Sequence, residues 1–254
     1  MNAEEALSWI VEEVIRRLQS RRKRALVIFT GGAIGYKEAI PQVKSLIKDG
    51  WNLRILLSNS AEYVLTPQLV KDQLEVDEVI VESEVKGLRP LYGDVNYFII
   101  PTLTLNSAVK IAIGIADTLV TNLVAHGIME GISIIAAKDA CDLKNSTRLN
   151  MGMNKTPAAY LSVMEEYLNR LEAYGIKLVD AEDLYKATIE EVNYSYKNQH
   201  TGKATQEFTK KVLSRTDIIK AKEADAVLYV NPSTIVTSLA HDTAREIGVK
   251  ILQK

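Results

Sequence analysis

The sequence of 254 residues contains few of the side chains that form disulfides or most zinc sites. It has one cysteine, Cys141, and three histidines, His126, His200 and His241. One cysteine excludes an intrachain disulfide, which fits a reducing, cytoplasmic setting. The histidines have no metal-ligand spacing, and with a single cysteine beside them we expect no metal site.

A strong charge of one sign and long apolar runs are also absent. The formal net charge is −1, from 31 basic and 32 acidic side chains, so no global field attracts nucleic acid or an anionic membrane surface. No apolar run approaches the roughly 20 residues that span a bilayer, and the first residues lack the apolar core of a signal peptide. We therefore expect neither a nucleic-acid partner nor a membrane partner.

Short β-branched runs alternate with helical patterns through most of the chain. We expect strands over residues 25–29, 53–57, 78–81, 97–100, 132–136 and 177–179. We expect helices over residues 36–48, 61–73, 107–115, 118–126 and 157–174. This alternation predicts βαβ units in a protein of the α/β class, with a Rossmann-like, doubly wound parallel sheet.

The two ends of the chain differ from this central domain, expected over residues 25–186. Residues 1–24 contain an amphipathic helix over 3–19 and a basic run, which is either a packed helix or a docking helix for a partner. Residues 187–254 are expected to form a linker and a C-terminal α/β extension, because 187–204 are polar and typical of a loop. The extension, with helices near 217–223 and 234–247 and strands at 227–230 and 249–251, is either a small subdomain or an arm.

A glycine-rich turn follows the first expected strand. Residues 27–37 read Val-Ile-Phe-Thr-Gly-Gly-Ala-Ile-Gly-Tyr-Lys, so an apolar run stops at two glycines and a helix is expected from Tyr36. Glycines let backbone N–H groups approach an anion, and a helix N-terminus adds partial positive charge. This order of strand, glycine turn and helix predicts a phosphate cradle.

Two departures from the dinucleotide-binding fingerprint indicate the kind of phosphate. Thr30 stands where the fingerprint has its first glycine, and the second strand ends in Ser58-Asn59-Ser60 rather than in an acid. Both argue against NAD and favour a phosphate monoester, to which the hydroxyls of Thr30, Ser58 and Ser60 would donate. Alternatively, the two serines cap the following helix. The expected amide donors are those of Gly32, Ala33 and Ile34.

The loop after the fourth expected strand is dense in short polar side chains: Thr102, Thr104, Asn106 and Ser107. Ligands of open α/β sheets bind at the carboxyl ends of strands, near the topological switch point. Asn106 offers both a donor and an acceptor, which suits the edge of a flavin or another amide-bearing ring. The alternative is an N-cap cluster for the helix that begins at Ser107.

These two segments resemble one known family. Residues 31–37 resemble its phosphate loop, Gly-Ser-Ile-Ala-Ala-Tyr-Lys, and residues 103–118 are similar to its Pro-Leu-Thr-Gly-Asn-Thr, Ala-Lys-Ile-Ala and Gly-Ile-Ala-Asp-Asn block. The family is the homo-oligomeric FMN-containing flavoproteins. It includes cysteine decarboxylases, flavin prenyltransferases, the dipicolinate synthase B subunit and archaeal electron-transfer flavoproteins. The resemblance covers about residues 25–180.

The resemblance implies FMN near a subunit interface of a trimer or a trimer-based assembly. It implies that the glycine turn with Ser58 and Ser60 holds the FMN phosphate, and that Thr104 and Asn106 approach the isoalloxazine. The complete expected cofactor-binding set is Thr30, Gly31, Gly32, Ala33, Ile34, Ser58, Ser60, Thr102, Leu103, Thr104 and Asn106.

Departures from the family pattern limit the function. The cysteine decarboxylases have a catalytic histidine shortly before the fourth strand, whereas residues 90–96 here contain none, which argues against cysteine decarboxylation. The Leu-Thr-x-Asn form is closer to the dipicolinate synthase and electron-transfer branches. We expect a redox or electron-transfer flavoprotein with a redox partner protein. The alternatives are a non-redox member resembling a decarboxylase, prenyltransferase or synthase subunit, and a structural member that binds FMN weakly or not at all.

Two further features extend the interpretation. Cys141 and Asp139 follow the fifth expected strand, at the sheet edge expected for the flavin. A thiol there is a candidate redox group, although a lone cysteine is more often a small buried residue. Residues 232–248 resemble a segment of enzymes encoded with bacterial microcompartments. Together with the N-terminal amphipathic helix, this resemblance implies an accessory role in or on such an assembly.

Overall fold

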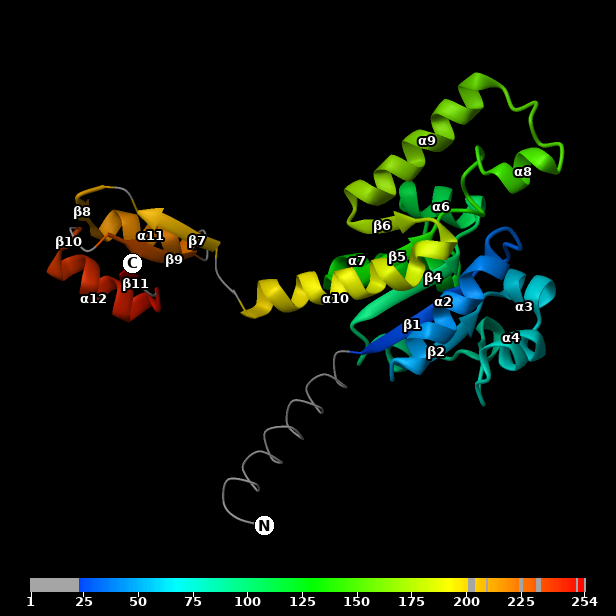
Figure 1. The fold of residues 1–254 in the computed structure, drawn as a ribbon, viewed down its shortest axis with the longest axis horizontal. Helices are drawn as coiled ribbons and strands as arrows, with labels where there is room; N and C mark the ends of the chain where they lie inside the picture. Colours follow the sequence, from blue (N-terminus) through cyan, green and yellow to red (C-terminus); the bar gives the residue numbers. More distant parts are fainter. Residues whose placement is uncertain are drawn as a thin grey trace, which may run out of the picture. The chain divides into compact units, whose positions relative to one another are not determined.

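The computed structural model describes residues 23–200, 204–208, 210–223, 226–231, 234–249 and 251–253. The chain divides into two compact units between Glu191 and Val192, and both are drawn in Figure 1. The helix expected over residues 3–19 lies outside the described residues. Among the helices that the structure describes, none combines the length and the apolar character needed to cross a bilayer.

Unit 1 is built on a six-stranded sheet in which every pairing is parallel. The strands are β1 (Arg24–Phe29), β2 (Asn52–Leu57), β3 (Ile80–Val81), β4 (Tyr97–Thr102), β5 (Ser133–Ala137) and β6 (Ile176–Val179). Their order is β3-β2-β1-β4-β5-β6. The chain winds outward from β1 to β3, then returns to β4 and winds the other way, so the predicted Rossmann-like, doubly wound fold is confirmed.

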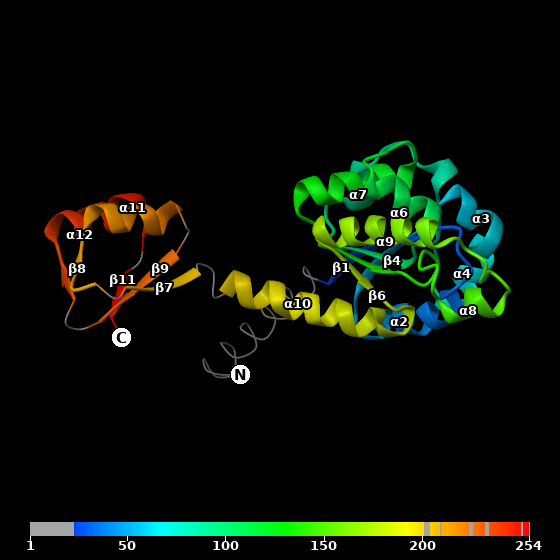
Figure 2. The same cartoon turned by 90° about the horizontal axis from the view of Figure 1, so that it is seen from above.

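Helices cover both faces of this sheet. In Figure 2, α6, α7 and α9 lie on one face and α2 lies on the other. Strand residues such as Leu26, Phe98 and Ile134 form one buried cluster with Val124 of α7 and Leu171 of α9. The helices of unit 1 before α10 are α2 (Tyr36–Lys48), α3 (Asn59–Leu65), α4 (Pro67–Leu74), α5 (Arg89–Tyr92), α6 (Leu105–Ala112), α7 (Leu119–Glu130), α8 (Ser146–Asn150) and α9 (Ala158–Ala173).

The single helix expected over residues 61–73 is wrong, because the structure breaks it into α3 and α4 at Thr66. Thr66 has φ 51° and ψ 141°, and Pro67 follows it. A residue before proline is forced out of the α region, so the first helix has to end there. The Thr66 hydroxyl then accepts a hydrogen bond from Leu69 N at 3.3 Å and caps α4.

The loop expected over residues 187–204 is also wrong for most of its length, because helix α10 (Leu184–His200) occupies it. Leu184, Ala187 and Thr188 are buried, and their spacing places them on one helical face. Lys177 Nζ donates to the Ala187 carbonyl at 3.3 Å, and Ser133 Oγ donates to Glu191 at 3.2 Å. A narrow buried face therefore stabilises α10, although its polar composition is typical of a loop.

Unit 2 has a core of its own. The parallel sheet has the order β11-β9-β7, and β10 pairs with β8. Leu213, Ile218 and Leu228 are buried together with Ala240 and Val249. The elements are β7 (Ala204–Phe208), β8 (Val212–Leu213), α11 (Arg215–Glu223), β9 (Ala226–Val230), β10 (Ile235–Val236), α12 (Ser238–Ile247) and β11 (Ile251–Gln253).

The buried face of α10 predicts a large stability difference between two substitutions. Leu184→Ala should lower the free energy of unfolding of unit 1 by about 2–4 kcal/mol, because it leaves a cavity. Lys186→Ala, at an exposed residue on the same helix within unit 1, should change it by about 0.5 kcal/mol or less. Urea unfolding followed by the fluorescence of buried Trp51, in a Trp9→Phe background, measures both. Equal effects would contradict the packing of α10.

Candidate functional site

The glycine turn connects β1 to α2 and packs closely against Ser60 and Ala140. A Cβ on Gly31 would lie 2.7 Å from the Ser60 Cβ, and one on Gly32 would lie 2.7 Å from the Ala140 Cβ. Gly35, with φ 80°, is the N-cap of α2 and supplies no side-chain hydrogen bond. The turn thus brings bare backbone to an uncapped helix N-terminus, which is the arrangement that binds anions.

The residue after the turn anchors α2. Tyr36 is buried, and its ring lies 6.0 Å from that of Phe29 in an edge-on arrangement. Burial raises the pKa of the Tyr36 hydroxyl to about 12. The position of the helix N-terminus is therefore set by the apolar contact with the end of β1.

The two serines after β2 have different roles in the structure. Ser58 is buried, and its Oγ accepts a hydrogen bond from Ala61 N at 3.1 Å, as in the helix-capping alternative. Ser60 is exposed on the first turn of α3, and its backbone lies against the position of Gly31. Ser60 is therefore the serine with a hydroxyl accessible beside the glycine turn.

Thr30 and Thr102 are buried and bonded to each other at the ends of β1 and β4. Thr30 Oγ1 donates to the Thr102 carbonyl, and Thr102 Oγ1 donates to the Thr30 carbonyl at 2.9 Å. Thr104 N donates to Thr30 Oγ1 at 2.9 Å. These bonds occupy the Thr30 hydroxyl, and Leu103 between the two threonines is fully buried. Thr30, Thr102 and Leu103 thus position the loop instead of facing a ligand.

Thr104 and Asn106 come to the same edge. Thr104 caps α6 and donates to Ser107 Oγ at 3.0 Å, while its Cγ2 lies 3.2 Å from where a Gly32 Cβ would be. Asn106 is exposed on the first turn of α6. The structure therefore gathers the glycine turn, Ser60, Thr104 and Asn106 around the switch point between β1 and β4.

Asp139 lies beside the N-cap of α2, since a Cβ on Gly35 would be 2.6 Å from the Asp139 Cβ, whereas Cys141 lies in the core. Asp139 Oδ2 accepts from Ala181 N at 2.7 Å, and burial raises the pKa of its carboxyl. Cys141 is fully buried in the core, its Sγ donates to the Lys138 carbonyl at 3.1 Å, and burial raises the thiol pKa to about 12. The thiol stays protonated at neutral pH, which is the behaviour of a small core residue.

A sequence model of the flavoprotein family matches residues 14–197. The chain belongs to this family. The uncharacterized protein MJ0730 of Methanocaldococcus jannaschii is 28% identical over 178 residues, which are 63% of this chain and 94% of that protein. Most of unit 2 lies outside the family match.

Solved structures give the same fold. DmrB of Burkholderia xenovorans, described as a cubic protein cage for redox transfer, has been solved without ligand and in complex with FMN. The two structures have a TM-score of 0.51 to this chain and 22% and 24% identity, and each comparison covers 68% of this chain and 96% of DmrB. The flavoprotein fold thus extends over unit 1.

Ala140 is the residue at this edge that sequence reasoning missed. Its Cβ lies directly under Gly32, so a larger side chain there would displace the glycine turn. Its only signal in the sequence is a small residue shortly after an expected strand, a feature too common to single it out.

Burial of Cys141 predicts a protected thiol. Native protein at pH 8 should react with Ellman's reagent at least about a hundredfold more slowly than protein unfolded in urea, because the thiol is buried and its pKa is raised. The chain has no other cysteine, so the absorbance change reports Cys141 alone. Rapid reaction of the native protein would restore Cys141 as a candidate redox group.

Proposed function

We propose that this flavoprotein binds FMN at the switch point between β1 and β4 and works in redox or electron transfer. One observation carries the proposal: the glycine turn that leads into the uncapped α2 lies beside Ser60 and Thr104, and Asn106 is exposed on the first turn of α6, which Thr104 caps. These groups come from the segments after three neighbouring strands, β1, β2 and β4, so they lie at the same edge of the sheet.

The donor set fits a phosphate monoester. The amides near Ala33 and the Ser60 hydroxyl are neutral donors, and the α2 dipole favours an anion there. The glycines are required because a Cβ on Gly31 or Gly32 would clash with the loops behind them. The second strand ends in Ser58 rather than in the acid that dinucleotide-binding proteins use for a ribose hydroxyl.

The neighbouring loop fits the ring of a flavin. Asn106 has an exposed amide with two donors and an acceptor, and Thr104 lies between it and the glycine turn. When bound, FMN supplies one- and two-electron transfer, and the protein orients the ring and tunes its potential. Among the described residues named at this edge, the polar groups are hydroxyls and amides, and the carboxylate of Asp139 is bonded to Ala181 N. This supports a redox role over acid–base chemistry.

A homo-oligomer is the second part of the proposal. Exposed apolar side chains gather on α8, on α9 and in the loop between them, which Figure 1 shows at the periphery of unit 1. They are Leu149, Met151, Met153, Tyr160 and Val163. Such a patch is typical of an interface. We propose that it packs against other copies in a trimer or a trimer-based assembly, with FMN near the interface.

The proposed setting is cytoplasmic, supported by the single cysteine, with a redox protein as the electron partner. Association with a bacterial microcompartment rests on the resemblance of residues 232–248 alone. The described part of that segment forms β10 and α12.

Replacing Ala33 tests the phosphate site. Ala33 is exposed in the glycine turn, and Ala33→Asp places a carboxylate where the phosphate would bind. We expect it to weaken FMN binding by about tenfold or more. The matched variant Ala33→Asn has the same shape without the charge and should stay within about threefold of wild type. Flavin fluorescence during titration with FMN measures both.

Gly87→Asp adds the same charge at a distant exposed glycine, where an added Cβ meets only Pro90 at 3.9 Å. It should leave FMN binding unchanged. Equal affinity of the Ala33→Asp and Ala33→Asn variants would place the phosphate elsewhere.

Anaerobic reduction with dithionite tests the role of the flavin. The absorbance of the bound flavin should bleach and should return on reoxidation. Failure of this cycle would remove the redox role while leaving FMN binding intact.

A charge in the apolar patch should break the oligomer. Val163→Glu on α9, at a side chain that is 41% exposed, should convert the assembly to smaller species, because an interface cannot bury an unpaired carboxylate. Met129→Glu at the end of α7, 73% exposed, is the control and should leave the assembly intact. Light scattering coupled to size exclusion gives the masses. A monomeric wild-type protein would contradict the proposal.

A further inference from the structure

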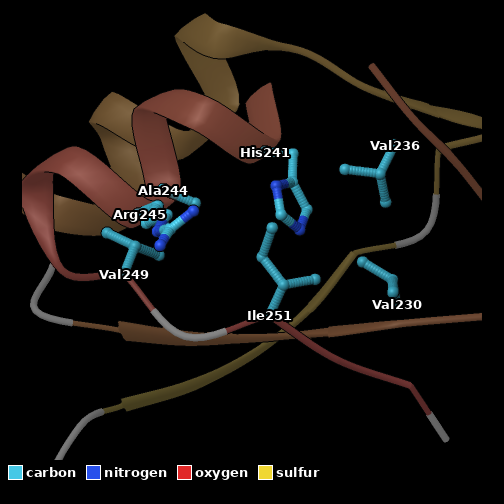
Figure 3. Close-up of a pocket in the computed structure, with 7 residues that line it drawn as sticks. All are labelled: Val230, Val236, His241, Ala244, Arg245, Val249 and Ile251. Atoms are coloured by element: carbon cyan, nitrogen blue, oxygen red, sulfur yellow. The ribbon is translucent and has the colours of Figure 1, made fainter. Parts of the chain in front are cut away.

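Unit 2 contains a cleft of about 550 Å³ between α12 and the strands β9, β10 and β11. Figure 3 shows its lining residues. Val230 and Ile251 come from the sheet, Val236 comes from β10, and Ala244 and Val249 lie on and just after α12. The cleft is thus walled by aliphatic side chains from four elements of one unit, and its volume is in the range of small-ligand pockets.

Two basic side chains complete the lining. His241 and Arg245 are four residues apart on α12, so they lie on one face of the helix. Figure 3 shows the His241 ring directed from α12 toward Ile251, with Arg245 beside Val249. Within the described residues, neither side chain forms a hydrogen bond or an ion pair. Lys210 of the same unit, by contrast, is paired with Asp217 at 3.1 Å.

Among the described residues, the ionisable groups that line the cleft are therefore all basic. The acids of α12, Asp242 and Glu246, each follow one of the two basic residues by one position, and neither lines the cleft. An anion with an apolar body matches this arrangement. Aliphatic walls shield its hydrocarbon part from water, and a guanidinium binds a carboxylate through two parallel hydrogen bonds.

We propose that this cleft binds a small monocarboxylate with a short aliphatic chain. Its carboxylate pairs with Arg245 and accepts from His241, and its chain lies against Val236 and Ile251, the aliphatic lining residues that are partly exposed. All residues of this site belong to unit 2 and lie beyond the family match. The competing explanation is that Arg245, in the last turn of α12, only interacts with the helix C-terminal carbonyls.

A homologous series of ligands tests the site on the full-length protein. Acetate, butyrate and hexanoate are titrated by saturation-transfer NMR, which suits large assemblies, with hexanol and hexylammonium as neutral and cationic probes of equal chain length. Affinity should rise about fourfold for each added CH₂ as the chain is buried, and hexanoate should bind far better than either control probe. No binding of hexanoate, or equal binding of hexanol, would overturn the proposal.

Two exposed arginines of unit 2 provide the matched variants. Arg245→Gln should weaken hexanoate binding by about tenfold or more through loss of the charge-assisted pair. Arg215→Gln at the start of α11 removes the same charge outside the cleft and should leave binding unchanged. Equal losses in both variants would indicate non-specific attraction. His241→Gln, also at an exposed residue, is a second test in case Arg245→Gln does not fold, and it should also weaken hexanoate binding. An unchanged affinity of His241→Gln for hexanoate would overturn the proposal.

Discussion

The reciprocal hydrogen bonds between Thr30 and Thr102 hold the two halves of the sheet together where the candidate site forms. The strands after β1 are added on one side of this pair, and those after β4 are added on the other side. The register between β1 and β4 shifts between Val27 and Phe29. Each hydroxyl donates to the other residue's carbonyl, and Thr104 N donates to Thr30. Thr30 and Thr102 are buried, so the loss of either hydroxyl would leave a buried polar group unsatisfied, at a cost of about 1–3 kcal/mol.

The site follows from this constraint. With Thr104 held to Thr30, its methyl group and the Ala140 Cβ, which lies after β5, both occupy the space that a side chain on Gly32 would need. The backbone has no space for a Cβ on that side. The Gly32 amide, one of the expected donors, is used within the turn, where it donates to the Thr30 carbonyl at 2.7 Å. The expected donors that remain for a ligand are the amides of Ala33 and Ile34, just before α2. In the proposed site, the surface that faces the ligand is then mostly main chain. For this reason the sequence signal in residues 30–37 is the presence of glycines, which have no side chain.

Prediction from sequence succeeded where one physical signal dominated. The helix Tyr36–Lys48 has the predicted bounds, because a strong amphipathic pattern begins directly after a glycine. Prediction failed where tertiary contacts determined the secondary structure. Burial of Leu184, Ala187 and Thr188 on one face stabilises a helix in a polar stretch that was expected to be a loop. Thr30 illustrates a third case. A threonine at this position suits either a donor to a phosphate or a hydrogen bond between two strands. Only the contact with Thr102, 72 residues away in sequence, distinguishes these two roles.

The two proposed sites stabilise negative charge by different means. At the glycine turn the donors are amides, a hydroxyl and a helix dipole, whose partial charges are fixed by the fold and act over the first turn of the helix. In unit 2 the cleft has formal charge on Arg245 at an exposed position, where salt screens the interaction. A dianionic phosphate held by neutral donors keeps its own charge next to the flavin, and negative charge near the ring opposes its reduction. Under the proposed function, the α2 dipole would compensate part of the phosphate charge and so raise the potential of the bound flavin, and the start of α2 would affect redox function as well as binding.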